Sequence, residues 1–364
     1  MKYLSWKDVE YMVYGGAFLA GGGGGGMDAG LAMLAELEKR YPDYKVPMIS
    51  PEEMKDDEYA AVFGGIGAPT AVDIKTVLDL FDKLLKHGYE VAAEEVPHGI
   101  AAALPPEQGS LCCILPILVS IAQGIPVVDA DGCDRACPGL ECCLYTLNGV
   151  PFYPGILTSE RGHVIRIEPS DPLDAAIIER TTRRILDLYE NMLGMTCWYS
   201  SKEDILTKLV PGTLSKAIAV GKAILEAKEK GVDVSETVGK LVPLKLLAEG
   251  VVTKKESVIN EGHDIATTIV TDAEGVEYRI LAANESMALE NLTTGETVMS
   301  CPDVICSIDK DNYYPLSTAD VLEGMHVQYF GTPVDEKWFA TETARNSFAP
   351  HFKKCGYEGP MVRF

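Results

Sequence analysis

The chain has 364 residues, of which 47% are hydrophobic, and it carries a formal net charge of −22. A chain of this length can bury a substantial core, and two domains are expected. The negative charge is spread without a Lys/Arg cluster, which argues against nucleic acid as a partner. Solubility alone explains acidity of this size, so the charge says little about a substrate.

The N-terminal segment and the most apolar window both argue against export and membrane insertion. Trp6, Asp8 and Glu10 interrupt the stretch where a secretory signal needs an apolar run. The window 111–128 contains Pro116 and further breaks, so a helix followed by a buried strand explains it better than a membrane span. We therefore expect a cytoplasmic protein.

Ten cysteines are present, but the chain is large for a disulfide scaffold, and a reducing compartment fits better. Four of them crowd one short segment: Cys133, Cys137, Cys142 and Cys143. None of the four shows the C-x-x-C spacing of a zinc or iron–sulfur site. Because free cysteine is among the most buried residue types, we favour buried apolar thiols over metal ligands here.

Helices and strands alternate through the first part of the chain. Ser5 followed by Asp8 predicts a helix over 6–18, and the glycine run 21–26 leads into a second helix that ends near Arg40. Strands are expected at 46–49, 59–63, 90–95 and 125–128, and further helices at 70–87, 111–122, 174–193 and 213–230. This alternation predicts an α/β domain with a largely parallel sheet and helices on both faces.

From about Lys254 the sequence changes to short β-rich pieces separated by turn residues. A compact β-barrel or sandwich is the simplest packing for this pattern. We accordingly divide the chain into an α/β domain at 1–243, which carries the active site, and a β-rich domain at 244–364.

The glycine run allows positive φ angles and brings backbone N–H groups close to a ligand, while the dipole of the following helix favours an electron-rich group. The predicted substrate-binding residues here are Gly22, Gly23, Gly24 and Gly25. A dinucleotide fingerprint would need a strand before the glycines, whereas a helix precedes them. A tight crossing of backbones without a ligand is the alternative explanation. Nucleotide-dependent chemistry at this run is a further hypothesis.

A second glycine segment, GGIGAP at 64–69, follows a strand and leads into a helix, so Gly65 and Gly67 are also predicted to bind substrate. In open α/β sheets, ligands bind beyond the carboxyl ends of strands. The two glycine turns and the turn of IPVVDADG converge there if their strands are neighbours.

Asp129 and Asp131, with Arg135 shortly after them, form the strongest polar cluster. The carboxylates could bind a divalent metal ion, or one could act as a general base while Arg135 holds an anionic substrate group. The alternative is that Asp129 caps a turn and Arg135 pairs with Asp131. Glu107, in PPEQGS, is a further catalytic candidate that could instead cap a helix. His98 is a candidate metal ligand, although a lone histidine is more often a surface or core residue.

The order of several motifs resembles one family, the S-methyl thiohydantoin desulfurases. The motifs are GGAFLAGGGGGG, GGIGAP, PPEQGS, GIPVVDADGCDRACPGL, PGTLSKAIAVGKAI, and CPDVICSID followed by VLEGMHVQYFG. The resemblance spans nearly the whole chain and implies a three-layer α/β N-terminal domain with a β-barrel-like C-terminal domain. This sequence departs from the family pattern D-A-D-G-x-G-R-A-F-P-E at Asp134, Cys137 and Gly139, and Asp134 adds a charge beside the predicted substrate site.

The resemblance implies hydrolysis of a C–S bond in a methylthio-substituted hydantoin-like ring, with release of methanethiol. Asp129, Asp131 and Glu107 suit the activation of water, and the glycine-turn amides suit binding of the ring atoms. The alternatives are a different cyclic amide substrate and a non-catalytic small-molecule binding or accessory protein. A homo-oligomer is one explanation for the C-terminal aromatic residues, which could equally close the core of their own chain. These residues are Phe348, Phe352, Tyr357 and Phe364.

Overall fold

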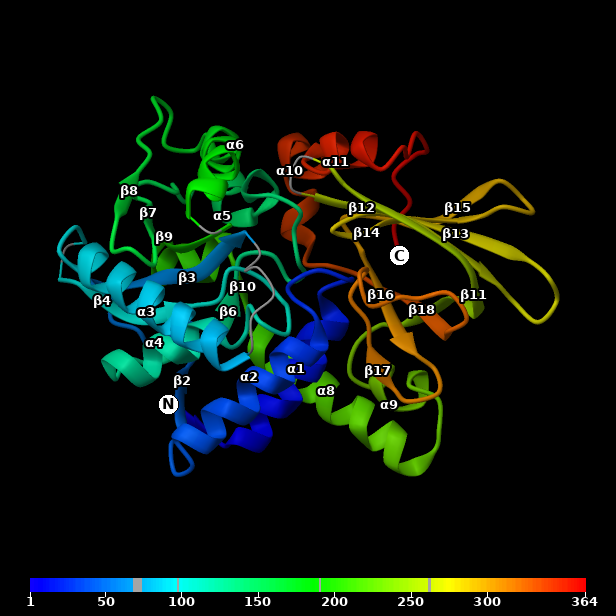
Figure 1. Cartoon of the computed structure of the whole chain (residues 1–364), viewed down its shortest axis with the longest axis horizontal. Helices are drawn as coiled ribbons and strands as arrows, with labels where there is room; N and C mark the ends of the chain where they lie inside the picture. Colours follow the sequence, from blue (N-terminus) through cyan, green and yellow to red (C-terminus); the bar gives the residue numbers. More distant parts are fainter. Residues whose placement is uncertain (68–73, 97, 190, 261–262) are drawn as a thin grey trace.

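Two eight-stranded sheets lie side by side in the computed structural model, which describes residues 1–67, 74–96, 98–189, 191–260 and 263–364 (Figure 1). The strands of the first sheet are β1 (Lys2–Leu4), β2 (Val46–Ile49), β3 (Tyr59–Gly67), β4 (Ile100–Leu104), β5 (Val127–Val128), β7 (Ile156–Thr158), β8 (Val164–Arg166) and β9 (Met192–Ser201). Those of the second are β11 (Lys245–Asn260), β12 (His263–Thr271), β13 (Glu277–Ala283), β14 (Glu285–Asn291), β15 (Glu296–Ser300), β16 (Val304–Asp309), β17 (Tyr314–Pro315) and β18 (His326–Thr332). Two short strands, β6 (Ala130–Asp131) and β10 (Val210–Pro211), pair separately.

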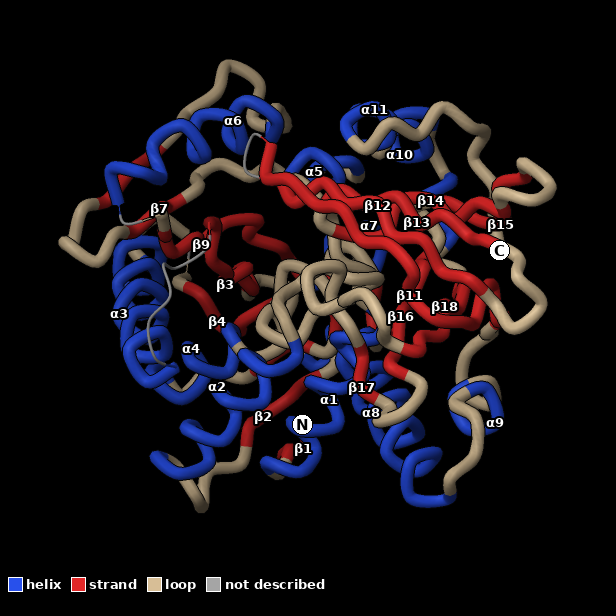
Figure 2. The backbone as a smooth tube through the Cα atoms, turned by 45° about the vertical axis from the view of Figure 1, so that its right-hand side comes forward, coloured by secondary structure: helices blue, strands red, loops and turns tan. Residues whose placement is uncertain are grey.

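The helices surround the first sheet and extend beneath and above the second (Figures 1 and 2). They are α1 (Trp6–Leu19), α2 (Met27–Arg40), α3 (Ile74–Ala93), α4 (Leu115–Gln123), α5 (Leu144–Leu147), α6 (Ala175–Ile185), α7 (Lys202–Lys208), α8 (Thr213–Lys230), α9 (Ser235–Val238), α10 (Glu342–Asn346) and α11 (Ala349–Lys354). Within the described ranges, no helix has both the length and the apolar character that crossing a membrane requires.

The first sheet has the order β1-β2-β5-β4-β3-β9-β7-β8. Its centre, from β2 to β3, is parallel, and antiparallel strands continue it on both sides. The α/β prediction for the N-terminal region is therefore confirmed. The second sheet is antiparallel throughout, in the order β15-β14-β13-β12-β11-β18-β16-β17.

The barrel-like closure expected for the C-terminal region is not formed among the described residues, and β15 and β17 remain the two ends of an open sheet. The C-terminal tail explains this outcome at one end. At the end of β15, the N–H of Ser300 donates to the carbonyl of Val362, and the N–H of Val362 donates to Ser300 Oγ. The tail thus occupies backbone positions that a closing strand would need, while β17 has only two residues.

Local capping and close helix packing build the base of the fold. Ser5 and Asp8 form a reciprocal capping box at the start of α1, as their spacing predicts. Helix α1 then crosses α8 almost backbone to backbone. A Cβ atom at Gly15 would lie 1.8 Å from the carbonyl oxygen of Ala217, and one at Gly221 would lie 1.8 Å from that of Tyr11. Glycine at these positions is what permits the crossing.

Two predictions for helices and strands of the N-terminal region are wrong. Residues 90–93 continue α3 instead of beginning a strand, and the strand lies further on, as β4. The helix predicted over 174–193 ends earlier, since 192 and 193 already belong to β9. In α3, Gly88 does not end the helix, because its missing side chain lets α3 approach Thr196 of β9, whose Oγ1 would lie 2.5 Å from a Cβ there.

The C-terminal aromatic residues pack largely within their own chain. Phe348 is buried and packs against Trp338 with tilted rings, 5.3 Å between the ring centroids. Phe352 and Tyr357 contact each other at 5.2 Å. Phe364 remains exposed. Figure 2 shows the helices of this segment, α10 and α11, beside strands β12 to β14, so the segment closes one side of the second sheet.

Candidate active site

The glycine run lies where the two sheets meet, and its neighbours approach it to backbone contact. A Cβ atom at Gly24 would lie 2.5 Å from the carbonyl oxygen of Gln108 and 2.5 Å from the Cα of Gly109. The carbonyl of Gly24 accepts a hydrogen bond of 3.1 Å from the N–H of Leu111. From the C-terminal region, the N–H of Ser286 binds the carbonyl of Gly21. The run therefore joins the loop that carries Glu107 to the second sheet.

The second glycine segment, expected from its sequence to form a turn, lies in a strand. Gly65 and Gly67 lie inside β3, not in a turn. A Cβ at Gly65 would collide with Met192 and Phe81, and one at Gly67 would lie 2.1 Å from the carbonyl oxygen of Asn191. Residues 68 and 69 of the motif fall outside the described ranges. In the described part, the segment serves packing against its neighbours, and substrate binding by Gly65 and Gly67 stays a prediction.

Asp131 is fully buried and organises the loop that follows it. Its Oδ1 accepts hydrogen bonds of 2.7 Å from the N–H groups of Cys133 and Asp134, and its Oδ2 accepts one of 2.7 Å from Gln108 Nε2. Burial, with a contribution from Asp134, raises the pKa of Asp131 to about 7. Asp131 thus connects the Glu107 loop to the turn of Arg135.

Asp129 has separate partners, because it faces the start of α8. Its carboxylate accepts hydrogen bonds from the N–H of Ser215 at 2.9 Å and from Ser215 Oγ at 2.5 Å. His98 is exposed and has a positive φ of 64°. Across the described residues, the clusters with three metal-capable side chains include neither of these residues nor Asp131. A divalent ion at Asp129, Asp131 and His98 remains a prediction.

Asp134 and Arg135 are both buried, and neither pairs with Asp131 through its side chain in the hydrogen bonds observed. Asp134 makes a 2.6 Å ion pair with Lys216 of α8, while burial raises the pKa of Asp134. Arg135 donates to the carbonyls of Ala136 at 2.8 Å and Pro302 at 2.5 Å. Arg135 therefore anchors the loop to the second sheet.

Part of the Arg135 guanidinium is left without a partner. Its Nη2 is buried and makes no hydrogen bond, although the guanidinium carbon lies 4.8 Å from the ring centroid of Phe348. Burial lowers the pKa of Arg135, but the neighbouring Cys301, Cys137 and Glu285 outweigh burial and raise it overall. The site thus contains a permanent positive charge with an unused donor.

Glu107 is partly exposed, as Asp129 is. Its Oε2 accepts a 2.8 Å hydrogen bond from the N–H of Cys137, and its Oε1 accepts a longer one, 3.4 Å, from Cys112 Sγ. Burial of the carboxyl, with the nearby Cys137 and Glu285, raises the pKa of Glu107 well above its ordinary value. Cys112 and Cys137 are also partly exposed, so a carboxyl and two thiols border this surface.

Glu285 is a candidate site residue that the sequence does not reveal. It begins β14, is only 2% exposed, and its Oε2 has no hydrogen-bond partner. Burial raises its pKa to about 8 against the opposing effect of Arg135. A Cβ atom at Gly23 would lie 2.0 Å from Glu285 Oε1. The sequence shows only one acid between Asn284 and Ser286, without a motif, and its place beside the glycine run comes from the fold.

Within the described parts of the chain, two groups of side chains could hold a metal ion by proximity. Ligand atoms of Cys133, Cys137 and Cys143 lie within 4.8 Å of one another, and the same holds for a second group made of Glu141, Cys142 and His351. Burial opposes ionisation of Cys137, but contacts with Cys133 and Cys143 and the charge of Arg135 outweigh it, so the pKa of Cys137 lies well below its ordinary value. The crowding of cysteines seen in the sequence is therefore also a cluster in space.

The fold and this site define an α/β protein with a second, antiparallel sheet and an acid- and thiol-lined site at the junction. The chain belongs to the S-Me-THD-like family: the model of its N-terminal domain matches residues 7–169, and the model of its C-terminal domain matches residues 173–359. A crystal structure of a protein from Chromobacterium violaceum is similar in fold, with a TM-score of 0.84 and 24% identity over 100% of this chain and 99% of that one. Among curated proteins, none matches this sequence.

The backbone crossing at Gly24 generates a stability prediction. We expect Gly24→Ala to lower the free energy of unfolding by about 2–5 kcal/mol, because it adds a close contact to the strain of a positive φ. Gly275→Ala is the control, since Gly275 also has a positive φ, of 84°, but nothing lies within 4 Å of its Cβ position. Urea unfolding of both variants measures the difference, and equal destabilisation would show that the crossing is unimportant.

The raised pKa of Glu285 generates a prediction about pH. The folded pKa of about 8 exceeds the ordinary value of 4.5, so the stability linked to this group is complete below pH 4.5 and is lost as the pH rises towards 8. The loss has a slope of at most about 1.4 kcal/mol per pH unit. The variant Glu285→Gln removes this component, so its unfolding free energy should fall less than that of the native protein between pH 5 and pH 8.

Chemical denaturation at several pH values measures that slope. The control is Glu277→Gln, on β13 of the same sheet, because the side chain of Glu277 is exposed. Its slope should equal that of the native protein. A Glu285→Gln slope that is no shallower would contradict protonation of the buried Glu285.

Proposed function

We propose that the protein is a hydrolase of a small hydantoin-like ring that carries an S-methyl group, and that it releases methanethiol. Membership of the S-Me-THD-like family supports a hydantoin-related activity. The observation that carries the proposal is the position of Glu107. Glu107 is partly exposed, as are Cys112 and Cys137, and the buried Glu285 lies near enough to act electrostatically on its carboxyl.

The proposed reaction requires two proton transfers. Water adds to the ring carbon that carries sulfur and forms a tetrahedral adduct, in which the former C=N nitrogen gains a proton. The C–S bond then breaks, the carbon becomes a carbonyl, and the leaving sulfur takes the remaining hydroxyl proton as methanethiol. One carboxyl group can relay these protons, since general acid–base catalysis uses such a side chain within hydrogen-bond reach of the reacting atoms.

In this mechanism, Glu107 moves the proton between water and the leaving sulfur. The N–H of Cys137 fixes Glu107 Oε2 at 2.8 Å and leaves Oε1 with the weaker thiol contact. Arg135 Nη2, which has no hydrogen-bond partner, supplies positive charge that stabilises negative charge developing on the ring. Asp131 and Asp129 would act through the loop and the helix that they hold, and Gly22 to Gly25 through the close packing that they allow.

A second candidate function is non-catalytic binding of a small cyclic amide. The observation that favours it is the saturation of the two predicted catalytic aspartates, because Asp131 accepts three hydrogen bonds and Asp129 two from within the chain. Carboxylates bound in this way hold the structure and are less available to a substrate. A binding protein would still need the glycine-lined junction and Arg135.

The variant Glu107→Gln tests the hydrolase proposal with an S-methyl thiohydantoin as the substrate and a thiol reagent to detect methanethiol. We expect kcat/KM to fall at least about 100-fold, the ordinary contribution of a general acid–base group. Glutamine keeps an acceptor for the Cys137 N–H, so the variant should fold. Glu160→Gln, at an exposed position after β7, is the control and should keep native activity.

The outcomes separate the two candidates. Native turnover that persists in Glu107→Gln would remove Glu107 from the mechanism. Thermal stabilisation by hydantoin analogues without any release of methanethiol would favour the binding protein.

A further inference from the structure

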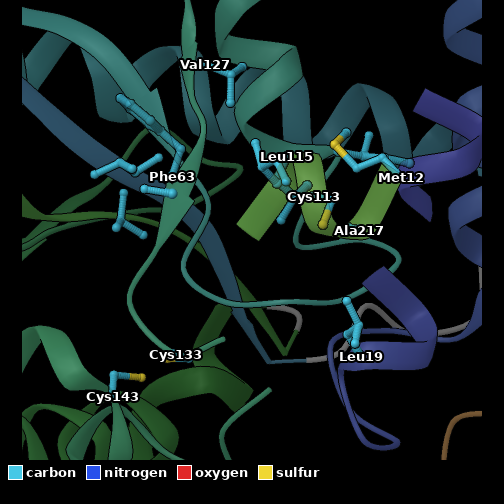
Figure 3. Packing of buried hydrophobic residues seen from close by; sticks show 14 of the residues in the cluster. Met12, Leu19, Phe63, Cys113, Leu115, Val127, Cys133, Cys143 and Ala217 are labelled. Atoms are coloured by element: carbon cyan, nitrogen blue, oxygen red, sulfur yellow. The ribbon is translucent and has the colours of Figure 1, made fainter. Parts of the chain in front are cut away.

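The three thiols at the junction form a compact group that the mechanism above does not use. Cys133 and Cys143 are buried, Cys137 is partly exposed, and their Sγ atoms lie within 4.8 Å of one another. Figure 3 labels Cys133 and Cys143 on neighbouring segments of the chain. No disulfide joins them, since all three are free.

The spacing of the sulfur atoms suits a metal ion. A tetrahedral zinc site with Zn–S bonds of about 2.3 Å separates its sulfur atoms by about 3.8 Å. The sulfur atoms lie at most 4.8 Å apart, so each pair needs to approach by at most about 1 Å to bind one zinc ion. Side-chain rotation can supply a shift of this size without moving the loop.

The loop around the thiols is held in place before any ion binds. The Asp131 carboxylate fixes the N–H of Cys133 at 2.7 Å, and Glu107 fixes the N–H of Cys137 at 2.8 Å. The N–H of Cys143 binds the carbonyl of Leu140 at 3.2 Å. All three ligands thus have anchored backbones, which lowers the entropy that binding must overcome.

Charge favours a divalent ion over a monovalent one. Three thiolates and a divalent cation leave one negative charge, and the fully buried guanidinium of Arg135 acts electrostatically on Cys137. The sum of these charges is zero, as burial in a low-dielectric interior requires. A monovalent cation would leave an uncompensated negative charge.

The second group, made of Glu141, Cys142 and His351, is less available to a metal ion because its side chains already bind other atoms. His351 Nε2 already lies 3.2 Å from Glu141 Oε1, and the Cys142 thiol donates to the carbonyl of Ser347 at 3.3 Å. These contacts would have to break before an ion could bind. The contacts of the three thiols to carbonyl oxygens are longer, at 3.6 Å for Cys133 and 3.7 Å for each of Cys137 and Cys143.

We propose that Cys133, Cys137 and Cys143 form a three-thiolate site for one divalent zinc-type cation. Its fourth position faces the partly exposed side, next to Glu107. Catalytic zinc sites keep a position of this kind for water or substrate, whereas structural sites are closed by four protein ligands. The proposal does not rest on the proposed hydrolase activity, because metal binding is measured directly.

Cobalt(II) titration of the reduced, metal-free chain tests the proposal. We expect one Co²⁺ per chain, with the intense visible bands of tetrahedral coordination and a thiolate-to-metal charge-transfer band in the ultraviolet. One equivalent of Zn²⁺ should abolish these bands, because zinc binds thiolates more tightly than cobalt does. The variants Cys137→Ser and Cys143→Ala should each weaken Co²⁺ binding at least about 10-fold.

Matched controls separate this site from the other candidates. Cys197→Ser removes a buried thiol on β9, and Asp129→Asn removes a ligand of the carboxylate site predicted from sequence; both should keep the cobalt spectrum. Circular dichroism shows whether each variant is folded. The proposal is overturned if the folded native chain binds no stoichiometric Co²⁺. It is also overturned if Cys142→Ser abolishes the spectrum while Cys137→Ser preserves it, since the ion would then lie at the second group.

Discussion

The junction between the two sheets depends on one steric constraint, the contact of backbone with backbone along the glycine run. Gly24 approaches Gln108 and Gly109 so closely that no side chain fits, and Gly23 leaves the space that Glu285 fills. The run therefore sets the position of the Glu107 loop on one side and of β14 on the other. A side chain in this run would separate the groups that make the site, even if each region kept its own fold.

Around this crossing the chain buries more ionisable groups than stability alone favours. Arg135, Asp131 and Glu285 are at most 2% exposed, and burying charge is unfavourable unless partners compensate for it. The compensation is uneven. Asp131 is fully hydrogen-bonded, whereas Arg135 and Glu285 each keep one unpartnered atom. Unpartnered buried groups of this kind are concentrated where proteins bind ligands or perform chemistry, and both lie at the junction.

Local features were predicted well from the sequence, and features that depend on distant contacts were not. The capping box at Ser5 and the glycine after α8 act within a few residues, so α1 and α8 were predicted almost to their ends. The helix predicted to end at residue 87 continues to Ala93, because Gly88 serves the close approach of α3 to Thr196 of another strand. The turn of Asp131 and the glycine run were predicted as site segments from their motifs, whereas Glu285 was not predicted, since a single acid at the start of a strand has no distinguishing pattern. The three thiols were noticed and assigned to packing, because spacing along the chain does not reveal proximity in space.

Strand β9 has a consequence for how the molecule can be divided. It lies within the part matched by the C-terminal family model, at 173–359, yet it pairs with β3 and β7 of the first sheet. A fragment cut at the family boundary would expose the long, apolar edge of β3, and bare edges of this kind recruit other chains into aggregates. The two family halves are thus interlocked, and evolution can exchange or lose one of them only by rebuilding the middle of the other.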